Sequence, residues 1–189
     1  MDKQQKELHW FEKLPAEKRK SKHSKVRGSS KERKPKKQTS MSKKKDVSLE
    51  KYTEEADRWI DEVAVYLKTA DRRDWAWSAL RGVLHAIRDR ITPEEVFQLS
   101  AQLPMLLRGL FLEGYNLNNK PEKFHLTDLI DRIEISMGPG VTLKPESAFK
   151  AVLLVLQDHV SEGEINDIYA TLPKDIRQLW DKSLEKYTV

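Results

Sequence analysis

Histidines are the first residues to consider for catalytic or metal-binding chemistry, and the chain has five. His85 and Asp89 are four residues apart in a stretch with helical periodicity, and this spacing would present two metal ligands on one helix face. We interpret His85 and His159 instead as partly buried helix residues with local hydrogen bonds, because the internal repeat described below duplicates neither of them. His125 follows Phe124 in a segment that we interpret as a linker.

Other familiar catalytic motifs are absent from the sequence. The chain has no cysteine, which excludes disulfides, thiolate nucleophiles and cysteine-ligated metals. There is no Gly-x-Ser-x-Gly or His-Glu-x-x-His motif, and the glycine loop from Met137 to Gly140 lacks the Lys-Ser/Thr of a phosphate-binding loop. The paired carboxylates are explained as favourable charges at helix N-termini: Glu94, Glu95, Glu162 and Glu164. We therefore predict no catalytic residue, no metal and no cofactor, with an unrecognised enzyme or ligand-binding protein as an alternative.

Positive charge is concentrated near the N-terminus. Residues 1–46 contain 17 of the 35 Lys and Arg residues but 6 of the 30 Asp and Glu residues, which gives a net charge of +11, against −6 for residues 47–189. So few apolar side chains lie between Pro15 and Asp46 that we predict a disordered tail. Cations spread along such a tail neutralise phosphates without reading sequence. The candidate polyanion-binding residues are Lys18, Arg19, Lys20, Arg33, Lys34, Lys36, Lys37, Lys43, Lys44 and Lys45.

Two other interpretations of the tail remain open. Residues 15–46 contain no Phe, Trp or Tyr on which nucleic-acid bases could stack. If the tail does not bind a polyanion, it is a solubility or spacer segment, or it folds back onto the acidic remainder of the chain.

The sequence after Asp46 has helical periodicity and indicates an all-α fold. Ala56, Ile60, Val63 and Leu67 recur at intervals of four, three and four residues, and Thr53 is the expected N-cap of their helix. A second helix ends near Ile91. A capping box then begins a third helix, and Leu103-Pro104 separates it from a fourth. We expect the apolar residues of this fourth helix to face the core: Leu106, Leu107, Leu110 and Phe111.

The series then repeats. A shift of 69 residues aligns Ala79–Phe111 with Ala148–Trp180 without a gap, and ten of the 33 pairs are identical. Average composition would give roughly two identities. The capping box recurs as Ser161-Glu-Gly-Glu164. This duplication predicts a bundle of two tandem repeats with about four helices each, in which each repeat buries its apolar face against the other.

The predicted organisation is a tail (1–46) followed by a duplicated helical domain (47–189). The first repeat spans about 53–115 and the second about 122–187, joined by an exposed linker at Glu113–Glu122. The charged residues of Met1–Leu14 do not fit a secretory signal, and the longest aliphatic run, Val152–Leu156, is too short to cross a bilayer. We expect a cytoplasmic protein without membrane contact.

Six strings in the duplicated region are specific when taken together: Ala79-Leu-Arg-Gly-Val-Leu-His-Ala-Ile-Arg-Asp-Arg90, Pro93-Glu-Glu95, Ala101-Gln-Leu-Pro104, Leu107-Arg-Gly-Leu-Phe-Leu-Glu-Gly-Tyr115, Ser161-Glu-Gly-Glu164 and Leu172-Pro173. They resemble the bacterial family known as domain of unknown function 2267. The resemblance covers about Asp57–Trp180, and Tyr115 stands where that family more often has Trp. It implies an all-helical duplicated bundle in a bacterial cytoplasm, without an activity or catalytic residues.

Two further residue groups could form a site. The tryptophans could line a ligand pocket, but we expect them to fill the core and the seam between the repeats: Trp59, Trp75, Trp77 and Trp180. Arg108 and Arg177 occupy equivalent positions, which would suit a two-fold anion site. A salt bridge or a cap on the preceding helix is the simpler interpretation.

We therefore predict a non-enzymatic interaction module whose tail binds nucleic acid or another polyanion, with a pure protein scaffold bearing an inert tail as the alternative. A helix-turn-helix reader fits less well, because the helix after Pro104 is too apolar. The identity of a protein partner and the oligomeric state do not follow from the sequence.

Overall fold

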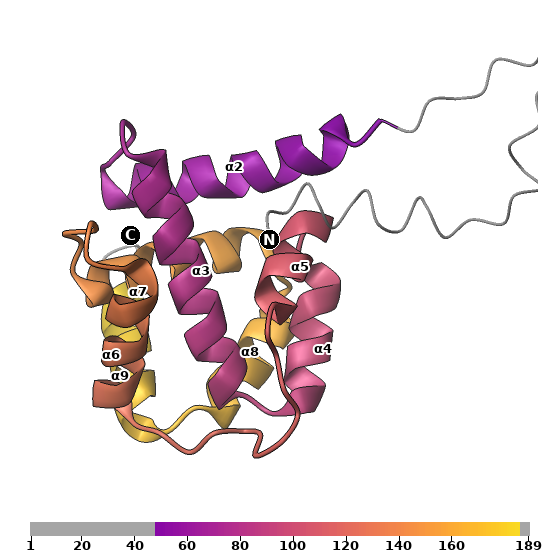
Figure 1. The fold of residues 1–189 in the computed structure, drawn as a ribbon. Helices are drawn as coiled ribbons and strands as arrows, with labels where there is room; N and C mark the ends of the chain where they lie inside the picture. The colour runs from indigo at the N-terminus through magenta and orange to yellow at the C-terminus, as the bar shows by residue number, and fades with distance from the viewer. Residues whose placement is uncertain (1–47, 186–189) are drawn as a thin grey trace, which may run out of the picture. The chain divides into compact units, whose positions relative to one another are not determined.

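The computed structural model describes residues 48–185, which form helices joined by loops (Figure 1). No strand occurs in this range, so the all-α prediction is confirmed. The predicted tail, residues 1–46, lies outside the described residues. The helices are α2 (Glu50–Leu67), α3 (Arg73–Arg90), α4 (Pro93–Gln102), α5 (Met105–Leu112), α6 (Leu126–Met137), α7 (Pro145–His159), α8 (Glu162–Thr171) and α9 (Lys174–Leu184).

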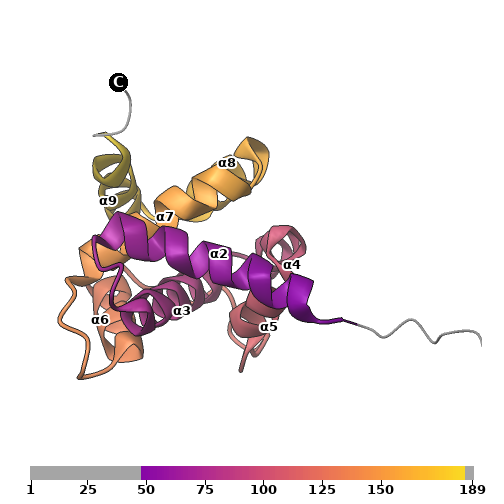
Figure 2. The same ribbon diagram turned by 90° about the horizontal axis from the view of Figure 1, so that it is seen from above.

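The centre of the domain is formed by α3 and α7. Both bury residues around most of their circumference, because other helices cover them on several sides. α2 crosses over α3 and α7 and buries Trp59 and Val63 against them (Figure 2). α6 packs against α3, where a Cβ added to Gly82 would lie 3.2 Å from Ser136 Cβ. The glycine therefore allows the close approach of these two helices.

The start of α2 differs from the prediction that Thr53 is its N-cap. The helix begins at Glu50 with Leu49 as the capping residue, and Thr53 lies within the first turn. There its hydroxyl donates a hydrogen bond of 2.7 Å to the Glu50 carbonyl. Ser48 takes part of the capping role, because its Oγ accepts the Glu50 N–H at 3.3 Å.

The loops before and after α4 and α8 are alike. Thr92 Oγ1 accepts the Glu95 N–H at 3.3 Å, and Ser161 Oγ accepts the Glu164 N–H at 3.5 Å. Both helices are followed by an extended leucine, Leu103 or Leu172. The two leucines are 2% and 3% exposed, as expected for matching core positions.

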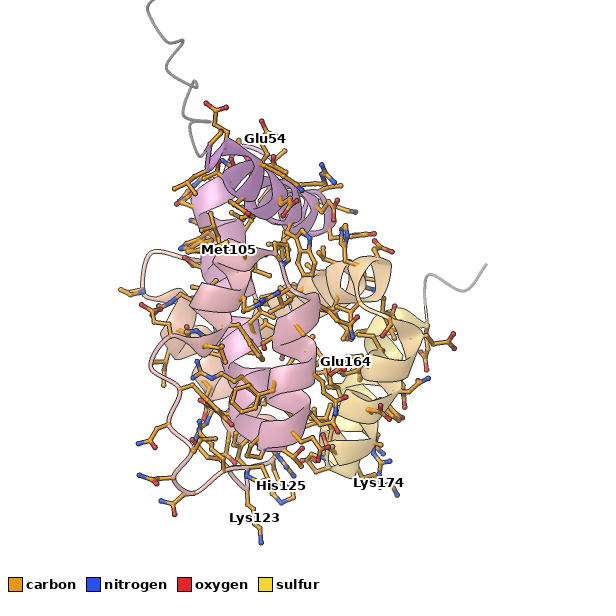
Figure 3. The ribbon with its side chains drawn as sticks, turned by 90° about the vertical axis from the view of Figure 1, so that its right-hand side faces the viewer. Glu54, Met105, Lys123, His125, Glu164 and Lys174 are labelled. Carbon is orange, nitrogen blue, oxygen red and sulfur yellow. The ribbon has the colours of Figure 1, made fainter. Side chains whose placement is uncertain are left out.

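The capping boxes predicted at these two sites are only half formed. Glu95 and Glu164 do not return a hydrogen bond to the N–H of Thr92 or Ser161. Instead, Glu95 Oε2 and Glu164 Oε1 are buried without a hydrogen-bond partner within residues 48–185. Their side chains turn towards the contact between α4 and α8 rather than back to the cap, and Figure 3 shows Glu164 where α8 faces α4. In both helix starts the N-cap hydroxyl therefore accepts its hydrogen bond, but the glutamate does not return the second bond of a capping box.

α4 and α8 run in opposite directions where they meet. Gln102, the last residue of α4, accepts the Ser161 N–H at 2.8 Å through its side-chain oxygen. Its amide nitrogen donates to Ser161 Oγ at 3.1 Å and to Glu164 Oε2 at 3.4 Å. The C-terminus of one helix is thereby joined to the N-terminus of the other.

Most of the connection between α5 and α6 is exposed, as its composition predicted, but the Lys120 side chain is not. Lys120 turns inward, with a side chain only 6% exposed, and its ammonium lies 2.8 Å from Asp89 and 2.5 Å from Glu122. The Glu122 N–H also donates to the Asp89 carbonyl at 2.9 Å. Asp89 and Glu122 compensate the burial of the lysine charge, so this part of the connection belongs to the packed structure.

Candidate interaction surface

A groove with exposed apolar side chains and one ion pair at its edge runs between α3 and α5. It has a volume of about 470 Å³. Trp77 and Leu106 are exposed at its surface, 39% and 45% respectively, although both were expected in the core. α5 is apolar almost throughout, and its burial of Leu107 and Phe111 leaves Leu106 on the outer face. We call this surface the α3–α5 groove, lined by Trp77, Arg81, Leu106, Gly109, Leu110 and Glu113.

Hydrogen bonds between α3 and the end of α5 fix the floor of the groove. Arg88, which is buried, donates from Nη1 to the carbonyls of Phe111 and Glu113, both at 2.8 Å. His85 Nε2 lies 2.7 Å from the Leu110 carbonyl, and this contact requires the nitrogen to carry a proton. Burial lowers the pKa of His85, which favours the neutral ring. The bonds from Arg88 satisfy carbonyls at and just after the end of α5, and the Leu110 carbonyl also accepts the Glu113 N–H at 3.1 Å.

One ion pair lies at the edge of the groove. Arg81 on α3 contacts Glu113, just after α5, with nitrogen–oxygen distances of 3.3 and 3.4 Å. The two side chains are 40% and 59% exposed. An exposed pair with long contacts adds little stability, about 1 kcal/mol at most. Both charges are therefore available to other partners.

The second repeat has a groove at the equivalent place, between α7 and α9, of about 330 Å³. Its chemistry is different. Glu146, Lys174 and Asp175 stand where the first repeat has Trp77, Met105 and Leu106. Figure 3 shows Met105 and Lys174, the first residues of α5 and α9, well apart on the domain. The α7–α9 groove is lined by Glu146, Ser147, Lys150, Leu179, Lys182, Ser183 and Glu185.

Gly109 adds to the contrast between the grooves. It lies inside α5, where glycine costs about 1 kcal/mol relative to alanine. A Cβ added there would meet nothing within 4 Å, so the packing of this domain does not require a glycine. The equivalent residue of α9 is Gln178. The outside of α5 in the first repeat thus carries exposed apolar side chains, Met105 and Leu106, next to a glycine.

The candidate polyanion-binding residues of the tail all precede Ser48 and so lie outside the described residues. Within the domain, His85 and His159 do not have the local hydrogen bonds that were predicted. His85 contacts a residue of α5, and His159 stacks on Trp59 at 4.7 Å between ring centroids and contacts Glu62 at 2.5 Å. Their partners are distant in sequence because α3 and α7 lie at the centre of the fold.

The tryptophans and the paired arginines are only partly as expected. Trp59 and Trp180 are buried core residues, whereas Trp77 is exposed. Arg108 caps the preceding helix, because its Nε donates to the Ser100 carbonyl at 2.7 Å and its Nη2 to the Ala101 carbonyl at 3.1 Å. Arg177 instead lies over the Tyr169 ring at 5.6 Å. The two arginines therefore form no symmetric anion site.

The α3–α5 groove was not predicted from the sequence, because the prediction used the residues that the two repeats share and not those in which they differ. The signal was present in the gap-free alignment, where three outer positions of α5 and its equivalent differ in character. Met105 aligns with Lys174, Leu106 with Asp175 and Gly109 with Gln178. A buried position would have kept its apolar character in both repeats, so the change itself indicates an outward-facing surface.

No three His, Cys, Asp or Glu side chains between residues 48 and 185 are arranged to hold a metal ion. Over the same range, no helix has both the length and the apolar character needed to cross a bilayer. The domain is an all-α protein that exposes Trp77 and Leu106 in the groove between α3 and α5. The chain belongs to the family described as "Uncharacterized conserved protein (DUF2267)", whose model matches residues 56–179. A search of curated proteins gave no match.

Proposed function

We propose that this protein is a non-enzymatic interaction module. Its helical domain docks another polypeptide in the α3–α5 groove, and its basic tail binds nucleic acid or another polyanion without sequence preference. The bacterial cytoplasm, which the family resemblance implies, is the proposed compartment.

The observation that carries the docking role is the difference between two grooves at equivalent positions. Both repeats bury apolar residues at matching core positions, whereas the grooves differ at exposed positions such as Gly109 and its equivalent Gln178. Trp77 and Leu106 expose much of their apolar surface, and a Cβ added at Gly109 would meet no atom of the domain within 4 Å. Exposed apolar strips of this kind are typical of protein-binding sites.

The role of the tail rests on the division of charge. Its net charge of +11 is sufficient for non-specific association with a polyanion, whereas the domain, at −6, repels one. A pure scaffold with an inert tail is the alternative, and DNA titration separates the two. Full-length protein should bind mixed-sequence duplex DNA at low salt and lose affinity steeply as salt rises. A chain beginning at Val47 should not bind. No affinity of the full chain at low salt would favour the inert tail.

Docking in the groove can be tested with a photo-crosslinking amino acid in cells of the native host. Placed at position 106 in the α3–α5 groove, it should give crosslinked protein adducts. Placed at position 178, an exposed position of α9 in the second repeat that is equivalent to Gly109, it should give none. Equal crosslinking at both positions would mean that the groove has no special role.

A further inference from the structure

We propose that the occupant of the α3–α5 groove is α5 of a second copy of this chain, so that the protein forms a two-fold symmetric dimer through this surface. The inference rests on the proposed function, since it names the partner of the same groove. It follows from the shape of the surface, from its charges and from the contrast with the second repeat.

The shape of the groove is self-complementary. Met105 and Leu106 protrude from α5, with exposed fractions of 56% and 45%. Gly109, one turn further along the same helix, leaves open space beside Trp77 and Leu110. In a two-fold contact, each surface supplies both the protruding side chain and the hollow that receives it. Leu106 of each chain can thus fill the space over Gly109 of the other.

The glycine indicates that the occupant is a helix. Small residues on a helix face let two backbones approach closely, and Gly82 has this role inside the domain where α3 meets α6. Gly109 is an equally small residue on a helix, but a Cβ added to it would meet no atom of the domain. A second helix packed at Gly109 would give this residue a structural role. If a two-fold axis passes through the groove, the α5 helix of the second copy is the helix that packs there.

The charges at the edge are also self-complementary. Arg81 and Glu113 provide one cation and one anion on the same rim, and their contact within one chain is long and exposed. When two such rims meet about a two-fold axis, Arg81 of each chain can reach Glu113 of the other. A partner with charges of a single sign would leave one of them unmatched.

The second repeat explains why association stops at two chains. The α7–α9 groove has Glu146, Lys182 and Glu185 among its lining residues, and α7, α8 and α9 carry no exposed large apolar side chain to match Trp77, Met105 and Leu106. A chain with one self-complementary surface closes as a dimer rather than growing into a filament. The dimer carries two tails of +11 each, so it can bind one polyanion at two points and with higher avidity.

The test is the molar mass of the full-length protein over a concentration series up to the millimolar range, by sedimentation equilibrium. Wild-type protein should approach twice the mass of one chain. Leu106→Asp places in the groove the residue that the second repeat carries, and it should weaken dimerisation by about a hundredfold or more. Gly109→Gln should also give monomers, and it cannot disturb the fold because Gly109 has open space around it. Circular dichroism of each variant establishes that it is folded.

Gln178→Glu is the matched control, because it adds a negative charge at the equivalent exposed position of α9 and should leave the dimer intact. A wild-type protein that stays monomeric would overturn the inference, as would a dimer that survives both groove variants. If the protein is monomeric but position 106 crosslinks to a different protein, the proposed function stands and self-association is wrong. If neither association nor crosslinking occurs, both proposals fail.

Discussion

Glu95 and Glu164, which are 69 residues apart, each leave one carboxylate oxygen buried without a hydrogen-bond partner within residues 48–185. Burial raises the pKa of Glu164, and the charges of Glu95 and Asp167 raise it further. Burial, together with the charges of Asp167 and Glu94, likewise raises the pKa of Glu95. The contact between α4 and α8 therefore gathers negative charge that the fold does not neutralise.

This arrangement predicts a particular pH dependence of stability. Because both pKa values are higher in the folded state, that state binds protons more tightly than the unfolded chain. The resulting stabilisation is present below the ordinary Glu pKa and is lost as pH rises towards the folded pKa values. We expect Glu164→Gln to raise the melting temperature at pH 7 and to change it little below about pH 4. Glu162→Gln, at an exposed position of the same helix, is the control. An equal effect of Glu164→Gln at both pH values would contradict this explanation.

A second prediction concerns Leu103, which is buried between α4 and α5. Leu103→Ala should reduce the free energy of unfolding by about 2–5 kcal/mol, because it removes apolar contacts and leaves a cavity. Leu106→Ala, at an exposed position of α5, should cost far less in the monomer. Chemical denaturation of both variants measures the difference. Similar decreases for the two leucines would mean that the core does not extend to Leu103.

The third prediction compares Asp89 with Asp158, the identical residue of the second repeat. Asp89 accepts hydrogen bonds from Arg88 and Lys120. Burial raises the pKa of Asp89, but these two cations together lower it by more, so the pKa is below its ordinary value. Asp89→Ala should cost about 3 kcal/mol or more, because it leaves the buried Lys120 with one fewer partner. Asp158 is exposed and accepts a hydrogen bond from Tyr66 at 2.8 Å, so Asp158→Ala should cost about 1 kcal/mol. Equal costs in urea denaturation would show that Lys120 is not held as described.

A fourth prediction concerns the tail. Replacing Lys43, Lys44 and Lys45 by Gln should weaken binding to all DNA sequences alike. The logarithmic slope of affinity against salt should become shallower by up to roughly 0.9 for each phosphate that these lysines no longer neutralise. Lys51→Gln, an exposed lysine of α2, should not change the slope. An unchanged slope in the triple variant would show that these three lysines do not bind phosphates.

The helices and the core could largely be predicted from sequence, because periodicity and capping are local. Val83, Leu99 and Leu103 lie where the apolar pattern predicts. The burial of Lys120 could not be predicted, because it depends on Asp89, which only the fold brings near. α5 was misjudged for a related reason. A short helix that is apolar on all sides has no periodicity to show which face is outward, and only the comparison of Leu106 with Asp175 carries that information.

The connection between α5 and α6 has a consequence for how two chains can meet. A duplicated protein can in principle exchange its second repeat with that of another molecule, if the joining segment opens as a hinge. Here Lys120 is held by Asp89 of α3, while Glu122 pairs with Arg132 of α6 at 2.7 Å. Opening the hinge would separate Lys120 from Asp89 and expose a buried cation, whereas the Glu122–Arg132 pair lies within the second repeat and would stay intact. The joining segment therefore works against domain swapping and keeps both repeats within one molecule.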